Sequence, residues 1–331
     1  MQPRPTLKSM AATLGVHVST VSRVLNGDPQ QASRAASAEV VARVRALAQS
    51  LNYRPNLQAT SLKTQRSRDI GVLLPCLADP LAGALYDGID EAAFAAGYTA
   101  LALPFQPGTR RGQDRIESAL RRQVAGLIIG DSAAADAGLL QSLQQQVPCV
   151  LVGHQQPGFA AIGSDDYAAG QAVAEHFYRQ GRRSAGLLAG PESAQPAPCL
   201  QGFIEYWQRQ GLEVPPGQVL HSPVAGDAGH ELGRRMLGLG VDALFAVHDV
   251  LAVGAMAAVH AVGRQVGRDV AVVGYHDLPW GGDLPVPLSS VRTPTARIGR
   301  LALQMLLRQV AGKAAKPLLL APQLVVRASS C

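Results

Sequence analysis

The chain has 331 residues, of which 47% are hydrophobic and 16% charged, so it can bury a large core in two or three domains. It has no segment patterned like a signal peptide and no apolar run long enough to span a bilayer, which argues against an exported or membrane-bound protein and predicts a cytoplasmic one. The formal net charge is +6, and residues 1–68 carry ten Lys or Arg but only two acidic residues. A basic segment on a nearly neutral body is typical of proteins that bind nucleic acid.

The first predicted elements form a helix, a turn and a helix over residues 6–26. The first apolar stripe comprises Leu7, Met10, Ala11 and Leu14, and the second comprises Val18, Val21, Val24 and Leu25. Gly15 interrupts the period between them, and Asn26 with Gly27 is a favoured helix stop. A pair of this kind can place its second helix in the major groove of DNA, where short polar side chains and an arginine reach base edges.

A polar loop is expected over residues 27–36, followed by a third helix from about residue 37 to 51. One stripe of this helix would close a small core with the first two, and consists of Val40, Val44, Leu47 and Leu51. Pro55 ends that helix, since proline disfavours helical geometry in the residue before it. Residues 56–63 could form about two further turns, too few to be stable in isolation.

From residue 69 the sequence alternates between short apolar runs and helical patterns. The runs cover 70–75, 98–104, 125–131, 148–154, 184–190, 243–249 and 270–277. Helical stretches such as 81–96, 167–180 and 250–262 lie between them. Continuously apolar strands separated by helices predict parallel sheets covered on both faces, and therefore a doubly wound α/β body.

Ligands of open α/β sheets bind beyond the carboxyl ends of the strands, so the residues after each apolar run are candidates. They are Asp79, Leu81, Phe105, Asp131, His154, Asp165, Glu192, Cys199, His248, Asp249, His276 and Asp277. A helix cap or an ordinary loop residue is an equally good interpretation of any one of them.

The sequence contains little that indicates a catalytic, cofactor-binding or metal-binding site. The sequence has no Walker loop, dinucleotide fingerprint or Ser-His-Asp order on a nucleophile elbow, and none of its eight histidines has the HExxH spacing. The four cysteines, at 76, 149, 199 and 331, have no paired spacing, which favours reduced thiols over disulfides or a zinc site. We therefore expect neither an enzyme nor a bound metal or cofactor.

Two strings carry a family resemblance. LGVHVSTVSRVLNG at 14–27 and LNYRPNLQATSLKT at 51–64 resemble the LacI/GalR family of bacterial transcription regulators. The resemblance implies a small all-α helix-turn-helix headpiece (1–55), a hinge helix and linker (56–68), and a body (69–331) of two Rossmann-like lobes of periplasmic-binding-protein type. We place the N-lobe at about 69–163 plus 294–318, and the C-lobe at about 164–293 plus 319–331.

The resemblance also implies a set of residues that contact DNA. Val18 and Ser19 match the family's base-reading pair, with Arg23 one turn later, and His17 stands where the family usually has a serine at the helix start. Leu62 matches the leucine that wedges into the minor groove, although an ordinary linker leucine remains the alternative. The predicted DNA-binding set is Thr6, His17, Val18, Ser19, Thr20, Ser22, Arg23, Asn26, Tyr53, Asn56, Ala59 and Leu62.

The resemblance also implies residues that contact the effector. Asp165 matches the family's effector-contacting carboxylate, and His248 falls where many members of the family have Asn. Cys199 replaces a common arginine and His276 a common aspartate, and this GYH variant resembles the gluconate-type branch. The resemblance therefore implies a sugar acid or related carbohydrate, with the two histidines as donors; a pocket that no longer binds the usual ligand class is the alternative. The predicted effector set is Leu81, Phe105, Asp165, Cys199, His248, Asp249, His276 and Trp280.

Together these features predict an effector-controlled, DNA-binding transcription regulator. We expect a repressor of carbohydrate or sugar-acid metabolism genes that binds a palindromic double-stranded DNA operator as a homodimer, without a membrane partner. Two alternatives remain, a solute-binding protein and a doubly wound enzyme, each with an incidental basic N-terminus.

Overall fold

The computed structural model describes residues 5–26, 29–53, 67–76, 79–106, 108–130, 137–191 and 197–331. The chain divides into two compact units, Met1–Ser67 and Arg68–Cys331. Within the described ranges, no helix is both long enough and apolar enough to cross a membrane.

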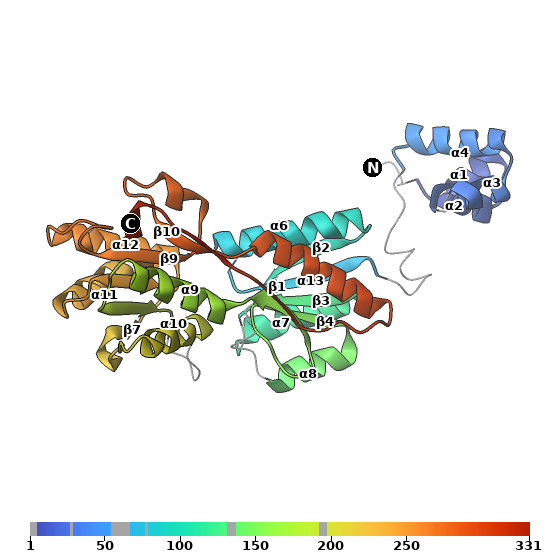
Figure 1. Cartoon of the computed structure of the whole chain (residues 1–331). Coiled ribbons are helices and arrows are strands. Elements are labelled where there is room, and N and C mark those ends of the chain that lie inside the picture. Colours follow the sequence, from blue (N-terminus) through green and yellow to red (C-terminus); the bar gives the residue numbers. More distant parts are fainter. Residues whose placement is uncertain are drawn as a thin grey trace. The chain divides into compact units, whose positions relative to one another are not determined.

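The first unit is helical (Figure 1). Its helices are α1 (Leu7–Leu14), α2 (Val18–Asn26), α3 (Pro29–Ala35) and α4 (Ala38–Ser50). Thr6 begins α1 with a capping box, in which its hydroxyl accepts from the N–H of Ser9 at 3.1 Å and its own N–H donates to Ser9 Oγ at 2.9 Å. Gly15 ends α1 with φ of 67°, a left-handed conformation that glycine adopts without a Cβ penalty.

Helices α1, α2 and α4 share one small apolar core. Its buried members are Met10, Ala11, Val21, Val24, Val44 and Ala48. Leu51, which the predicted stripe placed in this core, is instead 42% exposed. It lies one residue beyond α4 as the C-cap, so the helical period no longer directs its side chain inward.

The expected polar loop at 27–36 is also corrected, because α3 occupies Pro29–Ala35. Its sequence includes the good helix formers Gln30, Gln31 and Ala32, and Ala32 is 2% exposed. A single buried alanine gives no periodic apolar signal, which explains why the sequence pattern missed this helix.

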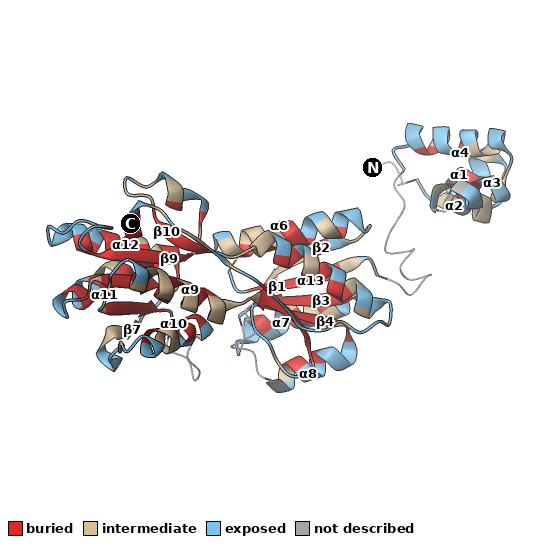
Figure 2. Ribbon diagram, in the orientation of Figure 1, coloured by how far each residue is buried: buried red, intermediate tan, exposed pale blue. Residues whose placement is uncertain are grey.

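The second unit contains two six-stranded sheets, whose strands are largely buried (Figure 2). The first sheet has the order β11-β5-β4-β3-β1-β2, and all its pairs are parallel. Its strands are β1 (Asp69–Leu74), β2 (Thr99–Pro104), β3 (Gly126–Gly130), β4 (Cys149–Val152), β5 (Ala160–Ser164) and β11 (Leu318–Leu320). Its helices are α6 (Pro80–Ala95), α7 (Arg110–Arg121), α8 (Ala137–Gln146) and α13 (Thr295–Val310). We call this the N-lobe.

The second sheet, in the C-lobe, has the order β12-β10-β9-β8-β6-β7 and is parallel except for the pair of β10 with β12. Its strands are β6 (Ala185–Ala189), β7 (Val219–His221), β8 (Ala243–Ala246), β9 (Ala271–His276), β10 (Ser289–Arg292) and β12 (Gln323–Val325). Its α-helices are α9 (Asp166–Arg179), α10 (Pro198–Arg209), α11 (Gly226–Gly238) and α12 (Asp249–Ala261). Short 3-10 turns are η2 (Pro216–Gln218), η3 (Pro279–Asp283) and η4 (Ala328–Ser330).

The chain passes between the two sheets three times, after β5, after β10 and after β11. As a result, α13 returns to the N-lobe and packs beside α6, as Figure 1 shows. The contact is close: a Cβ added at Gly88 of α6 would lie 2.0 Å from the carbonyl oxygen of Ala296 in α13. The α/β class with two parallel-sheet lobes and a helical headpiece, predicted from the sequence, is therefore confirmed.

Candidate functional site

The first candidate site is the exposed face of α2 in the N-terminal unit. Buried Val21 and Val24 fix one face of this helix against α1 and α4, while Arg23 and Asn26 are exposed. Ser22 and Asn26 are joined on that face by a hydrogen bond of 3.3 Å from Asn26 Nδ2 to Ser22 Oγ. The half-buried side chains along the helix are Val18, Ser19, Thr20, Ser22 and Leu25. A short helix with small polar side chains and one arginine on its outer face has the chemistry for reading base edges.

His17 immediately precedes α2 and replaces the usual hydroxyl cap with an imidazole. Its Nδ1 accepts the backbone N–H of Ser19 at 3.2 Å and lies 2.7 Å from Ser19 Oγ. The ring therefore satisfies one of the N–H groups that a helix start leaves unpaired. Tyr53 is half-buried against the same core after α4. Asn56, Ala59 and Leu62 lie outside the described residues.

The second candidate site lies at the carboxyl ends of β8 and β9, neighbouring strands of the C-lobe. His248 follows β8 and caps α12, with its Nδ1 accepting the N–H of Val250 at 3.2 Å. His276 ends β9, and the two imidazole rings meet edge to face with centroids 5.2 Å apart. Burial lowers the pKa of His248, and the negative charge of Asp79, which caps α6 in the N-lobe, acts in the opposite direction. The charge of an N-lobe side chain therefore acts on this C-lobe cluster.

His276 is held in a strained and neutral state. Its φ is +96°, which a non-glycine residue rarely adopts, and its Nδ1 is buried with no hydrogen-bond partner among the described residues. Burial lowers the pKa of His276 to about 3, with a further contribution from His248. The ring is accordingly uncharged at neutral pH.

Asp249 holds the backbone turn that follows His276. Its carboxylate accepts the hydroxyl of Ser290 and the N–H of Leu278, each at 2.6 Å, and its side chain is fully buried. Burial raises the pKa of Asp249 to about 6, and the bond from Ser290 opposes that shift. Gly274 makes this approach possible, because a Cβ there would lie 2.2 Å from Asp249 Oδ1. Asp249 is thus fully engaged within the C-lobe.

The remaining predicted effector residues are more dispersed. Asp165 caps α9 by accepting the N–H of Ala168 at 3.0 Å, and Leu81 is half-buried in the first turn of α6. Phe105 is 2% exposed and packs in the N-lobe core, whereas Trp280, in η3, is 37% exposed. Burial raises the pKa of Cys199 to about 12, so its thiol is a neutral member of the C-lobe core.

Two residues beside this cluster, Tyr275 and Asp166, were not among those predicted from the sequence. The Tyr275 hydroxyl donates to Asp166 Oδ1 at 2.6 Å, and the Tyr275 ring stands perpendicular to that of His276 with centroids 4.8 Å apart. Asp277, also at positive φ, accepts from Arg292 at 2.6 Å and from Arg327 at 2.7 Å. The Asp165-Asp166 doublet was the available signal for Asp166. Asp277 was a predicted strand-end candidate, but its pairing with Arg292 and Arg327, which are distant in sequence, was not predicted.

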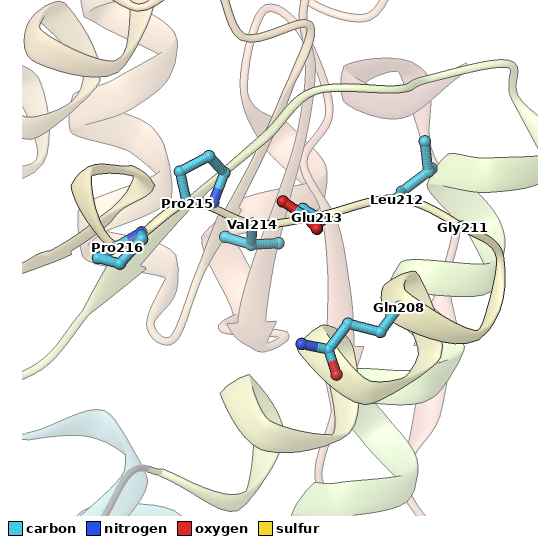
Figure 3. Close-up of a pocket in the computed structure, with 7 residues that line it drawn as sticks. All are labelled: Gln208, Gly211, Leu212, Glu213, Val214, Pro215 and Pro216. Atoms are coloured by element: carbon cyan, nitrogen blue, oxygen red, sulfur yellow. The ribbon is translucent and has the colours of Figure 1, made fainter.

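A separate hollow lies on the C-lobe, lined by Gln208 and residues 211–216 (Figure 3). It lies at the carboxyl end of α10, whereas Cys199 is near the amino end of the same 12-residue helix. A helix of that length spans about 18 Å. None of the residues that line the hollow belongs to the histidine pair, and the one charged side chain among them is that of Glu213.

Comparison with known proteins identifies the family of both units. Residues 6–56 match the LacI family of bacterial regulatory proteins, and residues 174–330 match a periplasmic binding protein-like domain. The transcriptional regulator GntR of Pseudomonas aeruginosa is 31% identical over 316 residues, covering 94% of this chain and 90% of that protein. The chain belongs to the LacI family. This LacI-family protein is a DNA-binding transcription regulator with an effector-binding body, and its function is regulation rather than catalysis.

Two further relatives span nearly the whole regulator. The ribose operon repressor of Escherichia coli K12 is 27% identical over 312 residues, covering 92% of this chain and 93% of the repressor. A crystal structure of the lac repressor dimer, bound to operator and the anti-inducer ONPF, superposes with a TM-score of 0.89 at 26% identity. That match covers 99% of each chain. The predicted family and class of function are confirmed.

Proposed function

We propose that this LacI-family regulator is a cytoplasmic repressor that binds a palindromic operator as a homodimer and responds to a sugar acid at the His248–His276 cluster. The observation that carries the effector proposal is His276, which combines positive φ with a buried, unpaired Nδ1. Each such backbone conformation costs about 1–3 kcal/mol and persists where the surroundings enforce it, often at ligand sites. Asp249 accepts hydrogen bonds from Leu278 and Ser290, which hold the backbone that follows His276.

The hydrogen-bonding capacity of the pair fits a carboxylate. Because Nδ1 of His248 accepts from the backbone of Val250, the neutral ring carries its proton on Nε2 and can donate from there. His276 is neutral as well and has one N–H to donate. Two neutral N–H donors can bind a sugar carboxylate without first losing a strongly hydrated positive charge.

Nearby acidic groups are arranged so that they repel an anion weakly. Asp277 is paired with Arg292 and Arg327, and the two carboxylate oxygens of Asp249 accept hydrogen bonds from Ser290 and Leu278 within the C-lobe. Asp79 and Asp165 cap helices of opposite lobes, and each carboxylate can still accept hydrogen bonds from sugar hydroxyls. We therefore infer a ligand with one carboxylate and several hydroxyls.

For DNA binding, we propose that α2 lies in the major groove with Ser19 and Arg23 reading bases and Val18 contacting a thymine methyl group. The operator-bound lac repressor dimer supports a homodimer by similarity. Residues 56–68 would be the hinge, with Leu62 as the minor-groove wedge. Effector binding between the lobes would reorient the N-lobes of the dimer and change the order of this hinge, and so the affinity for DNA.

Isothermal titration of the full-length protein tests the effector class. We expect gluconate to bind the wild-type protein and glucose, its neutral counterpart, to bind at least tenfold more weakly. His276→Asp should abolish the preference, since an ionised carboxylate repels the anion and offers no donor. Tight binding of glucose by the wild type, with none of gluconate, would overturn the proposal.

A further inference from the structure

The contact between His17 and Ser19 at the start of α2 has a consequence for base recognition. Nδ1 of His17 lies within hydrogen-bond distance of two groups of Ser19, the backbone N–H at 3.2 Å and the hydroxyl oxygen at 2.7 Å. Both residues belong to the turn that opens the helix, where side chains of a recognition helix approach base edges.

The backbone N–H fixes the direction of the second hydrogen bond. An N–H can only donate, so the Nδ1 atom that receives it carries no proton. A hydroxyl lying 2.7 Å from an unprotonated nitrogen must donate to it. The Ser19 hydroxyl has one proton, and that proton is thereby committed to His17. Only its lone pairs remain for a partner outside the protein.

We propose that His17 is a positioning residue that sets the base preference of Ser19 by making its hydroxyl an acceptor only. This inference rests on the proposed role of Ser19 as a base reader. A free serine hydroxyl can serve either kind of base edge. An acceptor-only hydroxyl pairs with the exocyclic amino groups of adenine (N6) and cytosine (N4), and meets the carbonyl oxygens of guanine and thymine unfavourably. Ser19 should therefore favour A or C over G or T at its position in each half-site.

Selection from a pool of randomised double-stranded DNA tests this with the full-length protein. The position read by Ser19 is the one whose preference disappears in Ser19→Ala. At that position we expect the wild type to favour A or C by about threefold to tenfold, the range of one net hydrogen bond. His17→Ser keeps a hydroxyl cap for the helix but no longer fixes the Ser19 proton. It should flatten the preference at this position and leave the other positions unchanged.

Ser9→Ala is the matched control, because it removes the side-chain bonds at the start of α1 without touching Ser19. It should reduce thermal stability by an amount similar to His17→Ser while leaving every base preference intact. The inference is overturned if His17→Ser retains the wild-type profile, if Ser9→Ala flattens the same position, or if Ser19→Ala changes no position. Failure of the wild type to enrich any sequence would instead contradict the proposed DNA recognition itself.

Discussion

His248 and His276, which end two neighbouring strands, place their imidazole rings edge to face with centroids 5.2 Å apart. Neither ring is expected to carry a charge at neutral pH, because burial lowers the pKa of both. The pair is therefore a neutral hydrogen-bonding surface at the edge of the C-lobe sheet. The neutral state and the position of the two rings depend on contacts that single substitutions can remove.

The stability of the protein should depend on pH through His276. An unfolded histidine binds a proton below about pH 6.5, whereas the folded ring resists protonation down to about pH 3. The unfolded state thus binds more protons in this window, so the free energy of unfolding contributed by His276 falls as pH falls. We expect wild type to lose stability relative to His276→Asn by up to about 1.4 kcal/mol per pH unit below 6.5.

Chemical denaturation at pH 7.5, 6.5 and 5.5 measures this difference. Taking the difference between variant and wild type removes the contribution of Asp249, whose raised pKa acts in the opposite direction. If the difference stays constant over this pH range, the His276 ring is not held neutral.

Asp249 should stabilise the C-lobe even though its charge is buried. Asp249→Ala would leave the Ser290 hydroxyl and the Leu278 N–H without their acceptor, at about 1–3 kcal/mol for each buried group. Asp114→Ala, at an exposed position of α7, is the control and should stay within about 0.5 kcal/mol. Equal unfolding midpoints for the two variants would show that the Asp249 contacts contribute nothing.

Two glycine-to-alanine substitutions should change the free energy of unfolding in opposite directions. Gly274→Ala would push a methyl group to 2.2 Å from Asp249 Oδ1, and we expect a loss of about 1–3 kcal/mol from such overpacking. Gly83→Ala, in α6, places its methyl group where no atom lies within 4 Å and should gain about 0.5–1 kcal/mol of helix stability. Thermal unfolding of both variants measures these changes. If Gly274→Ala were more stable than the wild type, the close approach of Gly274 to Asp249 would be contradicted.

Arg23 should discriminate between DNA sequences. If its exposed guanidinium reads a guanine, Arg23→Ala loses about 1–3 kcal/mol of affinity for the selected sequence and less for random DNA. Fluorescence anisotropy at fixed salt with both duplexes measures the two losses. An equal fall on both duplexes would identify Arg23 as a phosphate contact.

The sequence identified the strands that are long and apolar throughout, such as 126–130 and 271–276, because continuous burial leaves a continuous apolar run. It missed β10, in which Ser289 and Ser290 are buried polar residues. Their hydroxyls are satisfied by Arg327 and Asp249, distant groups that no local pattern can reveal. The short edge strand β7 is only half-buried or exposed along its length and gave no signal either.

In the candidate site, too, the sequence does not reveal features that depend on residues distant along the chain. The strand-end rule and the family resemblance selected His248 and His276, and the structure brings those two together. The resemblance cannot reveal that Asp249 is fully buried and engaged with Ser290, since that depends on how β9, β10 and α12 pack. The positive φ of His276 likewise has no signature in the sequence, where such a conformation is normally signalled by glycine.

In the proposed mechanism, a sugar acid at the His248–His276 cluster controls the affinity of the protein for DNA. The most direct test is a fluorescence anisotropy titration of the full-length protein with its selected duplex, with gluconate, with glucose, or with neither. Allosteric coupling typically changes affinity by about 5-fold to 150-fold. We expect gluconate to change the DNA affinity of the wild type by a factor in this range, glucose to change it little, and gluconate to leave the DNA affinity of His276→Asp unchanged. Identical DNA affinity of the wild type with and without gluconate would contradict it.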